Sequence, residues 1–244
     1  MKFQRWFALA LLLGLSLAGF SGIANAQEST PADGQSFPVQ IRFLNAMTSL
    51  DAVDVYINGD DENQRVIDGL QYGTASEPYE GTAPVTAVVV KQNVKGGFDR
   101  YLYSTIVPTE AGKEYLVVIS DLILIPTEFD TSRVGAGMAR ARLINAAPQA
   151  PALDVYASEA GAGIALTDLI PVVADIGYAG VTDGGELAAG AYDVVATETG
   201  TTTPAIEMQD VAFDAGQVYT MVVIGTPGST EHPLTLVTVS APGV

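Results

Sequence analysis

A stretch that the chain contains twice constrains its fold most strongly. Residues 41–56 read IRFLNAMTSLDAVDVY and residues 141–156 read ARLINAAPQAPALDVY, so that a shift of 100 positions aligns them without a gap. An internal repeat of this period predicts two copies of one structural unit. The identical residues are Arg42, Asn45, Ala46, Ala52, Asp54, Val55 and Tyr56, which fall on Arg142, Asn145, Ala146, Ala152, Asp154, Val155 and Tyr156.

The N-terminus has the features of a secretory signal peptide. Lys2 and Arg5 precede an apolar run from Phe7 to Phe20, and Ala24-Asn25-Ala26 supplies small residues where a signal peptidase reads. We therefore expect cleavage after Ala26. The apolar run is shorter than the roughly 20 residues of a spanning helix, and no cysteine follows it to carry a lipid. The mature chain is expected to be soluble and not to insert stably into a membrane. Its expected location is the periplasm, the cell surface or the medium. The alternative is that the apolar run stays uncleaved as a membrane anchor.

Charge excludes two classes of partner. The chain has 11 basic and 28 acidic residues, a net charge of −17. Loss of the signal peptide removes Lys2 and Arg5, leaving 9 basic against 28 acidic residues and a net charge of −19. Such a surface repels nucleic acid and anionic lipid, so neither is an expected partner. There is no cysteine, so each unit must be held together by its core.

Short stretches with a period of two predict β-strands throughout, separated by Gly, Pro and Asp turns. The nearest approach to a helix is 160–169, and its glycines weigh against one. Six or seven strands per repeat of about 100 residues predict an immunoglobulin-like β-sandwich. The expected strands are 39–45, 53–58, 85–92, 101–107, 114–121 and 122–126 in the first repeat, and 139–145, 153–158, 191–197, 206–213, 218–225 and 234–240 in the second.

The predicted fold class is therefore all-β, with two tandem immunoglobulin-like β-sandwich domains after the signal peptide. Two domains with so short a connection can pivot unless an apolar interface joins them. The expected segments are a signal peptide at 1–26, a disordered lead-in at 27–36, a first sandwich at 37–126, a linker at 127–137 and a second sandwich at 138–244.

Several recurring residues have predicted structural roles. Arg42 with Asp54, and Arg142 with Asp154, lie on the polar faces of consecutive strands and predict a cross-strand ion pair in each domain.

The segments EAGKEY at 110–115 and DAGQVY at 214–219 have the pattern of a tyrosine corner. In that motif the hydroxyl, here of Tyr115 and Tyr219, hydrogen-bonds to backbone a few residues upstream. Tyr72 and Tyr178 are expected to pack over a sheet edge.

Three motifs resemble one known family. NAAPQAPALDVY at 145–156, Ala-Gly-x-x-Tyr at 215–219 and IGTPGS at 224–229 are similar to the domain of unknown function 4397. This family occurs in secreted and surface-associated bacterial proteins, often as tandem copies. The resemblance covers nearly all of the mature chain and is closer in the second repeat, because MTSL at 47–50 replaces the proline-bearing segment in the first and Asp51 stands where the second has Pro151. It implies an immunoglobulin-like sandwich and export, but no activity, cofactor or functional residue.

The residues do not form a recognisable catalytic motif. The sequence has no G-x-S-x-G, H-E-x-x-H or G-x-x-x-x-G-K-[ST] pattern. The one histidine, His232, precedes Pro233 and is expected to be a surface residue. The segment 95–98 (KGGF) is read as a hairpin turn because no helix follows to complete a phosphate loop. We therefore expect a protein that is not an enzyme, with no cofactor.

The acidic loop Asp60-Asp61-Glu62-Asn63 is the best candidate for a metal site, because calcium prefers oxygen ligands. Its spacing does not fit an EF-hand, and the second repeat has Ser158-Glu159-Ala160-Gly161 instead. A solvated acidic loop is the favoured interpretation, and no metal ligand is assigned.

These observations favour an exported, non-enzymatic interaction or structural protein that presents two sandwich domains to an extracellular protein, a glycan or another copy of itself. The alternatives are a carbohydrate- or calcium-binding module and a glycosidase with only carboxylates, which would need two of them about 5–9.5 Å apart in a pocket. Glycan binding would use exposed aromatic rings; Tyr101 and Tyr103, expected on one face of a strand, are the candidates.

Overall fold

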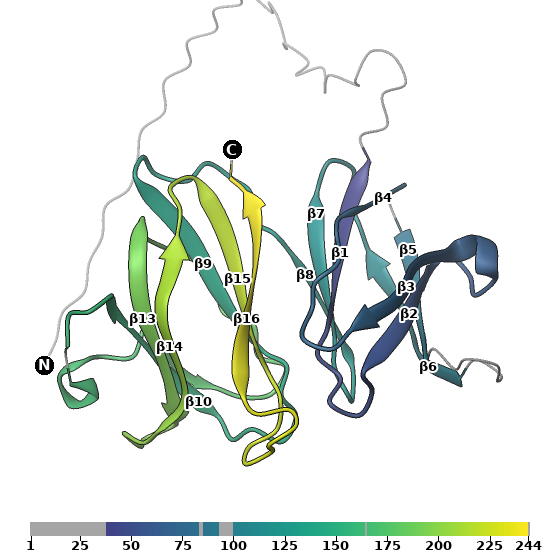
Figure 1. Cartoon of the computed structure of the whole chain (residues 1–244). Helices are drawn as coiled ribbons and strands as arrows, with labels where there is room; N and C mark the ends of the chain where they lie inside the picture. Colours follow the sequence, from purple (N-terminus) through teal and green to yellow (C-terminus); the bar gives the residue numbers. More distant parts are fainter. Residues whose placement is uncertain (1–37, 83–84, 93–99, 164, 244) are drawn as a thin grey trace, which may run out of the picture. The chain divides into compact units, whose positions relative to one another are not determined.

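The computed structural model describes residues 38–82, 85–92, 100–163 and 165–243. These described residues belong to one compact unit. Its described residues form β-strands and two single turns of 3-10 helix, η1 (Glu62–Gln64) and η2 (Leu166–Asp168) (Figure 1). The predicted signal peptide, the lead-in and the hairpin at 95–98 lie outside the described residues.

The first repeat folds into two four-stranded sheets with the orders β4-β1-β7-β8 and β3-β2-β5-β6. Strands β1 and β7 pair in parallel, and the other neighbours pair antiparallel. The strands are β1 (Val39–Asn45), β2 (Ala52–Ile57), β3 (Arg65–Gln71), β4 (Tyr79–Gly81), β5 (Val85–Gln92), β6 (Arg100–Pro108), β7 (Glu114–Ile119) and β8 (Leu124–Glu128).

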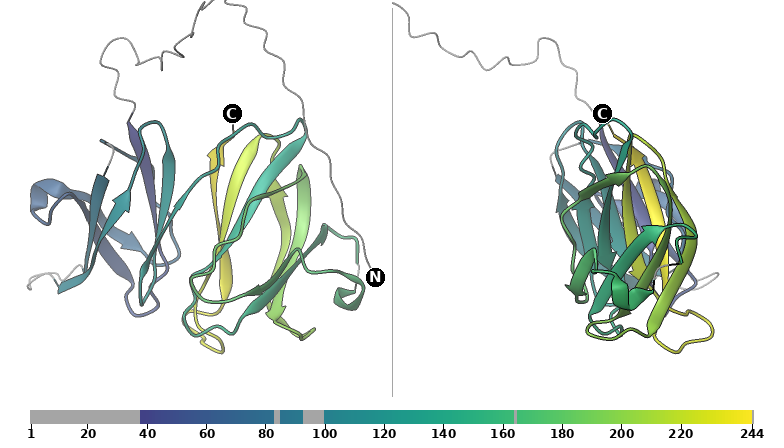
Figure 2. Two further views of the ribbon diagram at one scale, coloured as in Figure 1. Left: turned by 180° about the vertical axis from the view of Figure 1, so that it is seen from behind. Right: turned by 90° about the vertical axis from the view of Figure 1, so that its left-hand side faces the viewer.

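The second repeat has the same arrangement, with sheets β12-β9-β15-β16 and β11-β10-β13-β14. Here too the one parallel pair is the first strand with the seventh, β9 with β15. The two layers of each sandwich are visible from behind in Figure 2. The predicted all-β sandwich fold is confirmed. The strands are β9 (Met138–Asn145), β10 (Leu153–Glu159), β11 (Val173–Ile176), β12 (Gly185–Ala188), β13 (Gly190–Glu198), β14 (Pro204–Phe213), β15 (Gln217–Ile224) and β16 (Thr235–Pro242).

Four strands were not predicted from the sequence, and each is the edge strand of a different sheet. They are β3, β4, β11 and β12. β4 and β12 are only three and four residues long, and the four segments contain glycine or exposed acidic residues that interrupt an alternating pattern. Strand β8 extends two residues into the segment expected to be a linker, and Phe129 and Val134 in that segment are buried.

Each sandwich has its own apolar core between its two sheets. In the first, Ile41 and Phe43 of β1 pack with residues of β2, β5 and β7. In the second, Leu143 of β9 and Met221 of β15 pack with residues of β10, β13 and β14. The alternation that predicted the strands thus places these residues on the inner faces.

A third apolar cluster joins the two sandwiches. Leu44, Leu116 and Val118 on the outer faces of β1 and β7 pack in one cluster with residues of β9 and β15. Those partners are Ile144 and Val222, and all five residues have exposed fractions of 0%. The apolar interface that would prevent pivoting is therefore present.

The recurring asparagines close the same turn in both sandwiches. The side-chain amide of Asn45 donates to the Leu70 carbonyl (3.0 Å), and its Oδ1 accepts from the Met47 N–H (3.0 Å). Asn145 makes the equivalent bonds to the Ile176 carbonyl (3.1 Å) and the Ala147 N–H (3.1 Å). Both asparagines are fully buried, so the duplication preserves them for satisfying backbone groups in the core.

Both predicted tyrosine corners are confirmed. The Tyr115 hydroxyl accepts from the Glu110 N–H (3.1 Å), and the Tyr219 hydroxyl accepts from the Asp214 N–H (2.8 Å). In each case the bond runs five residues upstream and fixes the entry to the central strand β7 or β15.

We expect Tyr115→Phe and Tyr219→Phe each to lower the free energy of unfolding by about 1 kcal/mol, because each leaves a backbone N–H without its acceptor. Urea denaturation would measure the loss. Tyr101→Phe is the control, because the Tyr101 side chain is 55% exposed. A loss in the control equal to that in the corner variants would contradict the role assigned to the hydroxyls.

Candidate functional site

The predicted ion pairs between Arg42 and Asp54, and between Arg142 and Asp154, are wrong. The arginines lie on β1 and β9, whereas the aspartates lie on β2 and β10 in the opposite sheet of each sandwich. Consecutive strands of a sandwich need not pair, and these cross from one sheet to the other.

Each aspartate instead holds a bulge in the adjacent edge strand. Asp54 accepts from the Gly69 N–H (2.7 Å), and Asp154 accepts from the Asp175 N–H (2.9 Å). Gly69 and Asp175 both have positive φ, 68° and 54°, at points where the strand pairing shifts. The recurring aspartates are therefore explained by backbone geometry.

A second backbone bond anchors Asp154 further, because its Oδ2 accepts from the Gly200 N–H (3.0 Å). The side chain is nearly buried. The bonds from the Asp175 and Gly200 N–H groups hold the pKa of Asp154 below its usual value, because they stabilise the charged form.

The recurring arginines lie beside the interface between the sandwiches. The Arg42 Nε donates to Glu114 (2.7 Å) on the neighbouring strand. Arg142 reaches β8 of the first sandwich, where it donates to the Thr127 hydroxyl (2.9 Å) and the Glu128 carbonyl. Arg142 thus adds a polar connection to the apolar cluster.

Tyr72 and Tyr178 also reach across this interface rather than only covering a sheet edge. The Tyr72 ring lies 4.3 Å from the ring of His232, and the Tyr178 hydroxyl lies 2.6 Å from the Ser120 hydroxyl. His232, expected at the surface, is half-buried against Tyr72. His232 therefore contributes to packing between the two sandwiches through its contact with Tyr72.

The acidic loop is organised by its own polar contacts. Gln64 accepts from the Asp61 N–H (3.2 Å) and donates to the Asn58 carbonyl (2.9 Å), while Glu62 pairs with Arg65 (2.9 Å). Within the described ranges, no group of three or more His, Asp or Glu side chains could hold a metal ion.

Tyr101 and Tyr103 do not share a strand face. The pairing of β5 with β6 shifts between Val90 and Lys91, so that Tyr103 lies opposite Val90 and Tyr101 opposite Lys91. Tyr103 consequently packs against the first core, whereas Tyr101 is 55% exposed with the Lys91 ammonium 4.9 Å from its ring centroid. The bulge that separates the two rings was not foreseen from the sequence.

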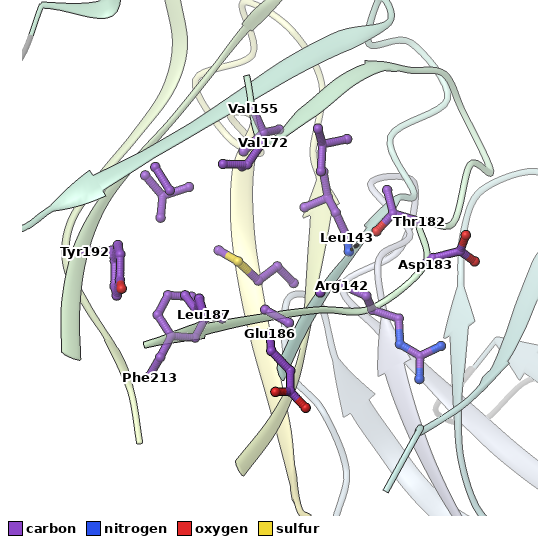
Figure 3. A pocket seen from close by; sticks show the side chains of 16 residues that line it. Arg142, Leu143, Val155, Val172, Thr182, Asp183, Glu186, Leu187, Tyr192 and Phe213 are labelled. Carbon is purple, nitrogen blue, oxygen red and sulfur yellow. Dashed lines mark hydrogen bonds between the residues drawn. The ribbon is translucent and has the colours of Figure 1, made fainter. Parts of the chain in front are cut away.

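An apolar pocket of about 300 Å³ opens into the side of the second sandwich. It lies between the edge strands β11 and β12, and its inner wall comes from β9, β10, β13 and β15. Leu143, Val155, Tyr192, Phe213 and Met221 line it, and Val172 at its mouth is 63% exposed (Figure 3).

The polar groups around this pocket already have partners or point outward. The Thr182 hydroxyl accepts from the Leu143 N–H (2.9 Å), and the Tyr192 hydroxyl donates to the Ala188 carbonyl (3.0 Å). Glu186 pairs with Arg140 (3.0 Å). In Figure 3 the charged ends of Arg142, Asp183 and Glu186 point away from the apolar side chains. The pocket is suited to holding an apolar group, and we find no arrangement for acid–base chemistry among its lining residues.

Comparison with known proteins identifies a family. Residues 39–156 match the model of the domain of unknown function DUF4397. These residues therefore carry a DUF4397 domain, and of the three motifs that resembled the family only the one at 145–156 lies within the match. The match covers the first sandwich and runs into β10 of the second, so a second tandem copy of the family domain stays a prediction. No curated protein matches the chain.

Solved structures give only distant likenesses. The Bacillus anthracis TIE protein has 8% identity and a TM-score of 0.25 over 77% of this chain, which spans 34% of that protein. A candidate cell adhesion protein from Bacteroides eggerthii has 12% identity and a TM-score of 0.24, with 86% and 97% of the two chains covered. A candidate cell adhesion protein from Parabacteroides distasonis has 8% identity and a TM-score of 0.23, with 85% and 100% covered. Scores this low carry no argument about function.

The described part of the chain contains no helix with the length and apolar character needed to cross a membrane.

We expect Asp154→Asn to lower the free energy of unfolding by about 1–3 kcal/mol near neutral pH, because one backbone N–H then faces an amide NH₂ instead of an oxygen. The lowered pKa makes this loss pH-dependent. The stabilisation by the carboxylate is complete above the unfolded-state pKa of about 3.9 and disappears as the pH falls through the lower folded-state pKa.

Urea denaturation of both proteins from about pH 7 to below pH 4 would test this pH dependence. The difference between wild type and variant should shrink as the pH falls. Asp183→Asn, at an exposed carboxylate, is the control and should change little. A difference that is the same at every pH would contradict the role of the Asp154 charge.

Proposed function

We propose that the protein is an exported, non-enzymatic interaction or structural protein whose two sandwiches act as one rigid unit outside the cytoplasm. The observation that carries this proposal is the use of the duplicated polar residues. Asn45, Asp54 and Tyr115, with their counterparts in the second repeat, hold turns, bulges and corners. Architecture thus accounts for the presence of these residues in both copies.

The remaining support comes from the sequence. The predicted signal peptide directs the chain out of the cytoplasm, and the strongly acidic mature chain suits a solvated surface protein. In a rigid tandem, the loops of both sandwiches keep constant positions relative to one another. Binding an extended partner that contacts both sandwiches then costs less conformational entropy, because the two sandwiches do not have to be fixed relative to one another.

An extracellular protein is the partner that we favour over a glycan. Carbohydrate recognition by stacking would use neighbouring exposed rings, whereas Tyr103 packs inward and leaves Tyr101 as the exposed ring of that pair.

Export can be tested by expressing the full sequence with a C-terminal tag in a bacterial host and fractionating the cells. We expect the protein outside the cytoplasm with Gln27 as its first residue, determined by mass spectrometry of the intact chain. Ala26→Tyr is the control variant, because a bulky residue at the cleavage position should block processing.

Accumulation of the uncut wild-type chain in the cytoplasm would overturn the exported part of the proposal. Turnover of chromogenic glycosides by the purified protein, lost on substitution of a single carboxylate, would overturn the non-enzymatic part and favour the glycosidase alternative.

A further inference from the structure

The pocket in the second sandwich has a specific origin in the divergence of the two repeats. In the first sandwich Ile41 of β1 lies opposite Tyr79 of β4. The equivalent positions of the second sandwich pair Ala141 of β9 with Gly185 of β12. A large cross-strand pair has therefore been replaced by the two smallest residues, at the mouth of the pocket.

The side chains on the inner face of β9 are also smaller than their counterparts in the first repeat. Phe43 becomes Leu143 and Met47 becomes Ala147, while all four residues remain in the cores of their sandwiches. The first sandwich pairs Val39 with Gly81, and the second pairs Ala139 with Leu187 at the equivalent position. Leu187 lines the pocket and does not close it. The second sandwich keeps the strand pairing of the first and has smaller side chains along β9, whereas Met221 of β15 is larger than Val117, its counterpart on β7.

The corresponding side of the first sandwich differs in its chemistry. It has a hollow of about 610 Å³ along β3 and β4, whose lining combines apolar side chains such as Ile67 and Leu70 with the exposed carboxylates of Asp68, Glu77 and Glu80. Tyr79 packs against the core behind it. The duplication thus supplies a natural comparison between a hollow rich in carboxylates and a mainly apolar pocket.

We propose that this pocket binds a small, uncharged, mainly apolar molecule, a function separate from the rigid tandem proposed above. Its volume is about twice that of a roughly 150 Å³ protein cavity that accepts benzene. Water is a poor occupant, because the Thr182 and Tyr192 hydroxyls already have partners and an internal water needs two to four polar contacts.

The mouth of the pocket selects against anions. Asp183 and Glu186 are exposed on its rim, and the chain has a net charge of −17. The Arg142 guanidinium, the cation in the lining, donates to the Thr127 hydroxyl and the Glu128 carbonyl, and its charged end points away from the apolar side chains in Figure 3. A carboxylate ligand would therefore meet the carboxylates of the rim and find no cation directed into the apolar part of the pocket. The exposed Val172 at the mouth extends the apolar surface outward.

The methionines supply a direct test. Met221 lines the pocket, whereas Met47 lies in the core of the first sandwich. The protein, labelled with ¹³C at its methionine methyl groups, would be titrated with 1-hexanol and separately with sodium hexanoate while its NMR spectrum is recorded. We expect 1-hexanol to shift the Met221 methyl resonance saturably, to leave Met47 in place, and to bind more tightly than hexanoate.

Gly185→Tyr restores the residue of the first sandwich and should remove the saturable shift. A Cβ at Gly185 meets no atom within 4 Å, so the backbone can accept the change. Gly177→Tyr is the matched control: its Cβ also meets open space, and Gly177 does not line the pocket. This control should bind 1-hexanol as the wild type does. Met47 lies in the first core and Met208 packs against the second, so unchanged resonances of both residues in the two variants would show that the variants fold.

Three results would overturn the proposal: no shift of Met221 up to the solubility limit of 1-hexanol, equal linear shifts of Met47 and Met221, or a saturable shift that survives in Gly185→Tyr. Hexanoate binding as tightly as 1-hexanol would refute the assigned charge preference. If Gly185→Tyr fails to fold, Ala141→Ile fills the opposite wall of the same opening and replaces it in the test.

Discussion

The apolar cluster between the two sandwiches is the contact on which the rest of the structure depends. Strands β7 and β15 are buried on both faces, with one face in a sandwich core and the other in the shared cluster. A strand enclosed in this way is apolar along its whole length rather than at alternate positions. Burial of this cluster makes the two sandwiches one compact body. Contacts of Arg142, Tyr72 and Tyr178 at the margins of the cluster also connect the two sandwiches.

The polar residues that recur serve this architecture because each satisfies backbone groups that the sandwich would otherwise bury. Asn45 and Asn145 close the turn after the first strand, and Asp54 and Asp154 hold the bulged edge strand. A buried N–H or carbonyl without a partner costs about 1–3 kcal/mol, which is a physical reason for both copies to carry these asparagines and aspartates. The second sandwich has small residues at Ala141 and Gly185 and keeps this polar framework.

Much of the fold could be predicted from the sequence, because the central strands have long alternating or continuous apolar patterns. The edge strands β3, β4, β11 and β12 could not be predicted, since they are short or bulged and depend on neighbours distant in the chain.

The failure to predict these edge strands also affected the candidate site. The pocket lies between β11 and β12, so neither wall was recognised, although the exchange of Ile41 for Ala141 in the aligned repeats was a visible signal. The Arg–Asp pairs were mispredicted because sequence spacing does not show which consecutive strands share a sheet, and the bulge beside Tyr101 was equally invisible. The continuous apolar run in β7 was the sequence signal of the interface.

Differential scanning calorimetry of the purified protein tests the central claim most directly, because a rigid pair should unfold cooperatively. The account predicts one transition whose calorimetric and van't Hoff enthalpies agree, since neither sandwich can unfold without exposing the shared apolar cluster. Two separate transitions, or a calorimetric enthalpy about twice the van't Hoff value, would show that the sandwiches unfold independently and would contradict the account.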